Sequence, residues 1–183
     1  MLTGAEASRT ILRSAVRGDR DAFAALMRQH QALVFGLAWN SLRDTAIAEE
    51  LAQDVFLELY GALPNLESPA HVVNWLRRVT IHRCIDHARR ERNRPRVPLD
   101  EVAEPVAPGA EGRADPYLTE RLRTLTSSLP ARARAVLLLR YQEELEPPEI
   151  AEILQIPVNT VKSQLHRALA LLRKKLQRTR VAT

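Results

Sequence analysis

Apolar residues recur at helical spacing through nearly all of the 183-residue chain. In the clearest case Ile47, Leu51, Val55 and Leu59 repeat every fourth residue, which places them on one face of a helix. No run of alternating apolar and polar residues is long enough to argue for a β-sheet. We therefore expect an all-α fold.

Capping residues indicate where several of these helices begin. Asp19 and Asp44 each precede a segment with helical periodicity and are predicted N-caps. Ser68 followed by Pro69 supplies a further N-cap and a proline at the first helical position. The first half of the chain is thus predicted to contain helices that begin after residues 19, 44 and 68.

Charge and proline content divide the chain into two helical domains. Residues 95–116 carry an excess of acidic residues and are interrupted by Pro98, Pro105, Pro108 and Gly109, which predicts a flexible acidic linker. We therefore expect one small helical domain over residues 1–94 and a second over residues 117–183. Each is near the lower size limit for an independent core, so each is expected to gain order from a docked partner.

The second domain ends in the pattern of a helix-turn-helix. Ile150, Ile153 and Leu154 form the apolar side of a short helix, residues 155–158 make a turn, and Val161 begins the apolar stripe of a basic helix. A basic amphipathic helix can be a merely solvated face, but the preceding helix and turn favour contact with duplex DNA. The candidate contacts on its outer side are Asn159, Ser163, His166, Arg167 and Lys174.

The net charge of +5 is concentrated in two blocks, with seven arginines between residues 71 and 94 and seven Lys or Arg residues between 160 and 180. A basic balance favours a polyanionic partner. From the residues alone, the first block fits a solvated surface and a phosphate-binding arm equally well. The acidic stripe of Glu50, Asp54 and Glu58 fits either a solvated face or a docking surface for a positively charged partner.

Metal and enzyme chemistry find little support in the residues. Cys84 is the only cysteine, which excludes an intramolecular disulfide and a thiolate cluster for zinc. His82 and Asp86 form one candidate ligand pair and Cys84 and His87 another, but the two pairs point to different sides of the helix. The sequence contains no glycine-rich phosphate loop and no recognisable nucleophile motif. We expect no metal, no cofactor and no enzymatic activity.

Membrane insertion is not expected either. No uninterrupted apolar run, residues 135–139 included, approaches the ~20 residues that a membrane span needs. The N-terminus lacks the charged start and apolar middle of a signal peptide. The sequence predicts a soluble protein of the reducing cytoplasm.

Three motifs taken together resemble the extracytoplasmic-function (ECF, group 4) sigma factors of the bacterial sigma-70 family. They are Ala48–Tyr60, Asn74–Arg90, and Leu129–Pro130 with the later segments Glu149–Glu152 and Thr160–Arg167. Their order and the linker between them match this family over nearly the whole chain. The resemblance implies a transcription factor that binds core RNA polymerase and directs promoter-specific initiation.

The resemblance also implies roles for individual residues. Core polymerase would be bound by Glu50, Gln53 and Asp54. The promoter's minus-ten element would be recognised and melted by residues of the first basic block: Asn74, Arg77, Arg78, His82, Arg83, Arg89 and Arg90. The minus-thirty-five element would be read as duplex DNA by the helix-turn-helix: Asn159, Thr160, Lys162, Ser163, His166 and Arg167.

Three further expectations come from the resemblance. The loop Leu63–Ala70 would capture an unpaired base of the melted strand, and flipping that base out of the stack costs a few kcal/mol that the contacts must offset. The acidic linker would thread through the polymerase. An anti-sigma factor would be a second protein partner.

Two other classes of function remain open from the residues themselves. A self-sufficient helix-turn-helix regulator would need its own dimer to read paired half-sites, and no separate dimerisation element is visible. A nucleic-acid-processing enzyme would need a carboxylate or metal cluster near the basic faces, and none is apparent. Tight duplex binding by the chain alone would favour the first of these alternatives.

Overall fold

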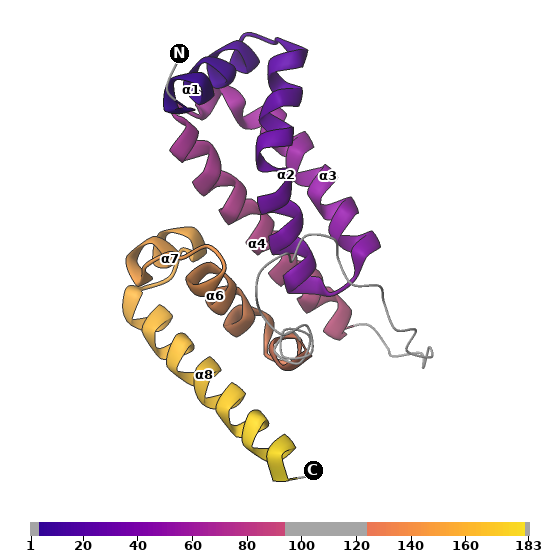
Figure 1. Cartoon of the computed structure of the whole chain (residues 1–183), viewed down its shortest axis with the longest axis vertical. Coiled ribbons are helices and arrows are strands. Elements are labelled where there is room, and N and C mark those ends of the chain that lie inside the picture. The colour runs from indigo at the N-terminus through magenta and orange to yellow at the C-terminus, as the bar shows by residue number, and fades with distance from the viewer. Residues whose placement is uncertain (1–3, 94–123, 182–183) are drawn as a thin grey trace.

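The computed structural model describes residues 4–93 and 124–181, and every regular element in these two ranges is helical. The expected all-α fold is therefore confirmed. The predicted linker, residues 95–116, lies outside the described residues, so its limits and those of the two domains stay predictions. Below, residues 4–93 are called the first module and residues 124–181 the second module. Figure 1 shows them as two helical bodies packed side by side.

The first module is a bundle of long helices. Its elements are α1 (Gly4–Val16), α2 (Arg20–Leu42), α3 (Thr45–Ala62), the short 3-10 helix η1 (Leu63–Asn65) and α4 (Pro69–Asn93). α1 is not among the elements that the capping signals predict.

The three predicted N-caps of this module are confirmed. The Asp19 carboxylate accepts backbone N–H groups at 2.9 and 3.1 Å at the start of α2, and Asp44 accepts the Ile47 N–H at 2.9 Å at the start of α3. Ser68 Oγ accepts the His71 N–H at 3.2 Å, and Pro69 is the first residue of α4. These bonds satisfy N–H groups that have no partner within the helix.

The core of the first module consists of apolar side chains from α1 to α4. Val34, Val55, Leu59 and Leu76 are fully buried in it. Burying a side chain of this size stabilises the fold by about 1.5–3 kcal/mol. The four-residue repeat on α3 thus marks the buried face of that helix, as its periodicity predicts.

The second module contains the expected helix-turn-helix. Its elements are α6 (Ala131–Tyr141), α7 (Pro147–Leu154) and α8 (Val158–Val181). Gln155 ends α7 in the left-handed conformation, with φ 53°, and the Ile156 N–H donates to the Ala151 carbonyl at 3.1 Å. Such a left-handed residue is a common way to end a helix and turn the chain sharply. α8 begins at Val158, so the turn falls where the sequence predicts it.

The two modules share an apolar core, which the sequence does not reveal. Leu37 of α2 and Ile81 of α4 are completely buried, yet they belong to a cluster whose other buried members come from the second module. Val136, Ile150 and Val161 are among those members. Each module therefore covers part of the other's apolar surface. The two modules are thus docked partners of each other, which fits the small size of each.

Arg134 of α6 links the two modules through hydrogen bonds. Its guanidinium donates to the backbone carbonyls of Ser41, in the last turn of α2, and of Leu129 and Ser127 in the second module. Helix C-termini carry partial negative charge, so a cation is favourable at the end of α2. Burial lowers the pKa of the Arg134 guanidinium. Nearby, Asn40 Nδ2 donates to Gln142 Oε1 at 2.9 Å.

Candidate polymerase and nucleic-acid interfaces

The residues predicted to bind polymerase lie on the solvent face of α3. Glu50, Gln53 and Asp54 are all exposed, whereas Leu51 and Val55 beneath them are buried. The structure therefore brings the three predicted residues together on one accessible surface.

Two large apolar side chains adjoin this acidic group. Leu57 is 74% exposed and Tyr60 53% exposed. At ~100° per residue, Leu57 lies almost directly in line with Glu50, two helical turns away. Sequence reasoning missed Leu57, although its offset from the buried four-residue repeat of α3 was a usable signal. Exposed apolar residues ringed by charge are common at protein–protein interfaces.

The seven residues predicted to bind the minus-ten element all lie on α4, but on more than one face. Asn74, Arg89 and Arg90 are exposed, while the other four side chains are half-buried. The half-buried four divide into groups that contact different neighbours.

Arg77 and His82 contact the second module. Arg77 Nε lies 2.9 Å from Glu143 Oε2 in an ion pair whose side chains are only 18% and 9% exposed. His82 Nε2 lies 3.1 Å from the carbonyl oxygen of Ile153, at the end of α7. In this conformation both side chains are engaged within the chain.

Arg83 points toward α3 instead. Its guanidinium pairs with Asp54 at 3.4 Å and with Glu58. Arg83 and Arg90 also line a groove of about 420 Å³ together with Glu50 and Asp54. Two residues predicted for DNA thus share a groove with two predicted for polymerase. These exposed ion pairs contribute little stability, about 0–1 kcal/mol each, so they are readily exchanged for other partners.

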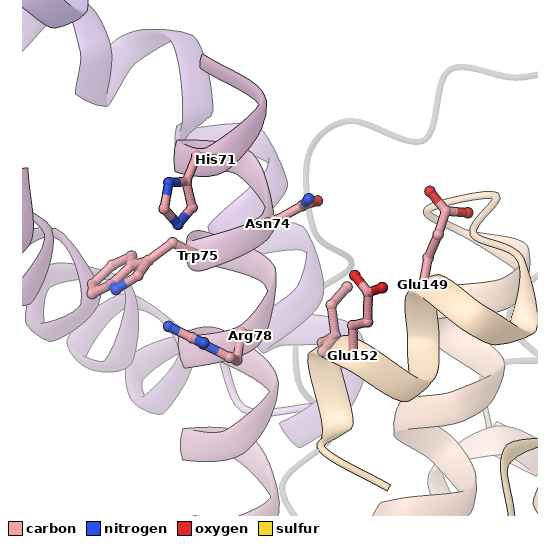
Figure 2. A pocket seen from close by; sticks show the side chains of 7 residues that line it. His71, Asn74, Trp75, Arg78, Glu149 and Glu152 are labelled. Atoms are coloured by element: carbon pink, nitrogen blue, oxygen red, sulfur yellow. The ribbon is translucent and has the colours of Figure 1, made fainter. Parts of the chain in front are cut away.

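Asn74 and Arg78 line a cleft between α4 and α7. The cleft has a volume of about 290 Å³, and Figure 2 shows the side chains of α4 on one side and those of α7 on the other. His71 and Trp75 complete the α4 side, and the α7 side presents Glu149, Glu152 and Ile153.

The predicted minus-thirty-five contacts lie on the first half of α8. Asn159, Lys162, Ser163, His166 and Arg167 are exposed, and Thr160 is half-buried. Val161 and Ala168 on the opposite face are fully buried. Ser163 Oγ donates to backbone carbonyls one turn earlier, at 2.9 and 3.1 Å, so its hydroxyl is partly used within the helix. This arrangement leaves a basic and polar face of α8 exposed, and a helix of this kind can enter the major groove of DNA.

Cys84 is buried, with 3% of its surface exposed. Burial raises the pKa of its thiol to about 12, although Ser41 and Arg134 nearby act in the opposite direction. A thiol that keeps its proton is a poor nucleophile and a poor metal ligand.

Among residues 4–93 and 124–181, no three His, Cys, Asp or Glu side chains are placed to hold a metal ion together. None of the helices described in those ranges has the length and apolar character of a membrane span.

Comparison with known proteins matches both modules. Residues 26–94 match the family model of sigma-70 region 2, and residues 119–172 match that of sigma-70 region 4. The ECF RNA polymerase sigma factor SigW of Bacillus subtilis is 32% identical over 174 residues, which cover 88% of this chain and 92% of that protein. The RNA polymerase sigma-H factor of Pseudomonas aeruginosa is 31% identical, covering 88% of this chain and 89% of the other.

Two solved structures share the fold. RpoE of Bartonella quintana, determined in complex with the anti-sigma factor NepR, superposes with a TM-score of 0.68 at 19% identity, covering 85% of this chain and 96% of that chain. CnrH, determined with the cytosolic domain of CnrY, gives a TM-score of 0.65 at 21% identity and covers 93% and 97% of the two chains.

Proposed function

The chain belongs to the ECF sigma factors of the sigma-70 family, and from this premise we propose that three of its faces divide the work of transcription initiation. The exposed face of α3 binds core RNA polymerase, α4 holds the melted minus-ten strand, and α8 reads the minus-thirty-five element as duplex. The self-sufficient regulator is not favoured, because matches to both region 2 and region 4 are present in one chain.

The observation that carries the polymerase assignment is the mixed character of the α3 face. Glu50 and Asp54 provide negative charge, and Leu57, at 74% exposure, provides an apolar anchor in line with Glu50. An anchor of this kind supplies affinity when a partner buries it, whereas surrounding charges mainly set the rate and orientation of association. The complementary partner surface is therefore basic with an apolar pocket.

The two DNA assignments rest on exposed side chains of two different helices. Asn159 and Arg167 expose side chains suited to adenine and guanine edges in a major groove. Lys174, farther along α8, is exposed and suited to phosphate. On α4, Arg89 and Arg90 are exposed beyond the region that the second module contacts, where they can hold a strand through its backbone.

The remaining proposals concern partners and location. We infer that the chain acts by binding, without catalysing a reaction, since sigma factors as a class contribute recognition to polymerase. We further infer that it works in the cytoplasm, where core polymerase is found. The similar structures of RpoE and CnrH were determined with NepR and CnrY bound, which supports the proposal that an anti-sigma factor controls this chain as well.

The α3 assignment is tested by charge reversal. Glu50→Lys combined with Asp54→Lys is expected to weaken binding to core polymerase at least about tenfold at low salt, equivalent to about 1.4 kcal/mol. Glu49→Lys, an exposed neighbour on the flank of α3, is the matched control and is expected to bind like the unchanged chain. Binding is measured by fluorescence anisotropy, and specific initiation is mapped by sequencing transcript starts on genomic DNA. Undiminished initiation by the double variant would defeat the assignment.

A further inference from the structure

Arg83 of α4 reaches across to the acidic face of α3. Its guanidinium pairs with Asp54 at 3.4 Å and also with Glu58, and these two carboxylates lie one helical turn apart on α3. The three side chains are between 39% and 51% exposed. A cation of the chain itself therefore stands at the solvent edge of the surface that is proposed to bind polymerase.

The groove between α3 and α4 brings opposite charges together along the same face. Its α3 wall carries Glu50 and Asp54, and its α4 wall carries Arg83 and Arg90. Glu50 forms no ion pair with another described residue. Of the three carboxylates of the acidic stripe, Asp54 and Glu58 are thus already matched by a cation, whereas Glu50 is left for a partner.

This arrangement weakens the attraction of the α3 face for a basic surface in two ways. A basic side chain of polymerase that approaches Asp54 or Glu58 must share the carboxylate with Arg83. One exposed ion pair then replaces another of similar strength, so the exchange adds little affinity. Arg83 also reduces the charge that draws a basic partner toward α3: three carboxylates and one guanidinium leave a net charge of −2, against −3 for the stripe alone.

We propose that Arg83 belongs to the polymerase interface and sets its affinity, by competing with basic side chains of polymerase for Asp54 and Glu58. This proposal rests on the proposed function, which assigns the α3 face to polymerase. Removal of Arg83 therefore strengthens polymerase binding, whereas loss of a residue that contacts only the minus-ten strand would leave it unchanged. A residue of α4 thus adjusts the affinity while the carboxylates that make the contact stay the same.

The test compares two variants that lose the same charge from the same helix. Arg83→Gln removes the competing cation and keeps a polar side chain. Arg92→Gln is the matched control at an exposed position, nine residues farther along α4 and therefore on its opposite side at ~100° per residue. Affinity is measured by displacement of a fluorescent copy of the unchanged chain from core polymerase, and association rates are measured by stopped-flow mixing.

At low salt, Arg83→Gln is expected to bind core polymerase about three- to tenfold more tightly than Arg92→Gln, mainly through faster association. The difference should shrink at high salt, because salt screens exposed charges. Arg83→Lys is expected to stay close to the unchanged chain, since the competing charge remains. Equal affinity of Arg83→Gln and its control would overturn the proposal. Weaker binding by Arg83→Gln would overturn it too, because Arg83 would then hold the carboxylates in place for polymerase.

A double-mutant cycle locates the competition. In a background of Asp54→Asn with Glu58→Gln, the further change Arg83→Gln is expected to give a much smaller gain, because the carboxylates for which Arg83 competes are absent. An undiminished gain in this background would refute the competition for these two carboxylates.

Failure of the α3 assignment gives a different result. If Glu50→Lys with Asp54→Lys bound core polymerase as tightly as the unchanged chain, the proposed function of the α3 face would fail. If that variant bound weakly while Arg83→Gln matched its control, only the role of Arg83 would fail.

Discussion

The buried thiol of Cys84 makes stability depend on pH in a calculable way. Its pKa is about 12 in the folded chain against an ordinary value of 9.0. The folded state therefore holds the proton more tightly than the unfolded state, so stability falls as pH rises above 9 and would fall until pH reaches the folded value. At pH 10 the unfolded thiol is about nine-tenths ionised and the folded thiol about one-hundredth. This difference lowers the free energy of unfolding by between about 1 and 2 kcal/mol relative to pH 8.

The assay compares the unchanged chain with Cys84→Ala. Urea unfolding followed by circular dichroism at pH 8 and pH 10 gives the loss of stability for each protein. All other residues are the same in both proteins, so the difference between the two losses belongs to Cys84. In thermal unfolding the same difference is expected to be about 2–8 °C for a chain of this size. An equal loss in both proteins would refute the account of the buried thiol.

Thiol reactivity gives an independent check on Cys84. At pH 8 the folded thiolate fraction is about one in ten thousand, against about a tenth for the unfolded thiol, so a disulfide reagent should react about a thousandfold more slowly with the folded chain. Reaction within tenfold of the unfolded rate would contradict this. The thiol is accordingly assigned a structural role in the packed chain.

Four further substitutions test the fold and the DNA assignment. Asp44→Ala should lower the free energy of unfolding, measured by urea titration, by about 1 kcal/mol through loss of the α3 cap. Ile81→Ala should lower the free energy of unfolding by about 2–5 kcal/mol. It should also reduce hydrogen-exchange protection in α6 and α7, although the residue lies on α4. Intact protection in α6 and α7 would argue against a shared core. For promoter binding by the polymerase complex, Lys174→Ala should reduce the slope of log affinity against log salt concentration by about one, because one phosphate contact is lost. An unchanged slope would contradict the phosphate role of Lys174. Arg167→Ala should instead change which base is preferred in the minus-thirty-five element.

The local features of this fold could be read from the sequence because they depend on neighbours a few residues apart. Asp44 is recognisable as a cap because the N–H group that it accepts is three residues away. The buried face of α3 follows from a four-residue repeat, and the turn near Gln155 from the change of pattern around it. The exposed residues of α3 and α8 are those that lie out of phase with the buried repeats, so their exposure can be predicted as well.

The residues of α4 could not be divided in the same way. Arg77, Arg78 and Arg83 have the same charge and lie on one helix, yet they face Glu143, the interdomain cleft and Asp54 respectively. Which of them is free for a strand depends on how a separate module packs against α4. Periodicity records that a residue prefers burial or water, and it carries no information about which distant element covers it.

The sequence by itself thus determined where α2, α3 and α4 begin, the helix-turn-helix and the family, and it predicts which residues contact polymerase and DNA. Only the tertiary structure decided that Leu37 and Ile81 belong to a core shared by both modules, and that Glu143 holds Arg77. The physical reason is that these contacts join residues far apart in the chain. Their energy comes from burying surface that each module, read alone, would leave in water.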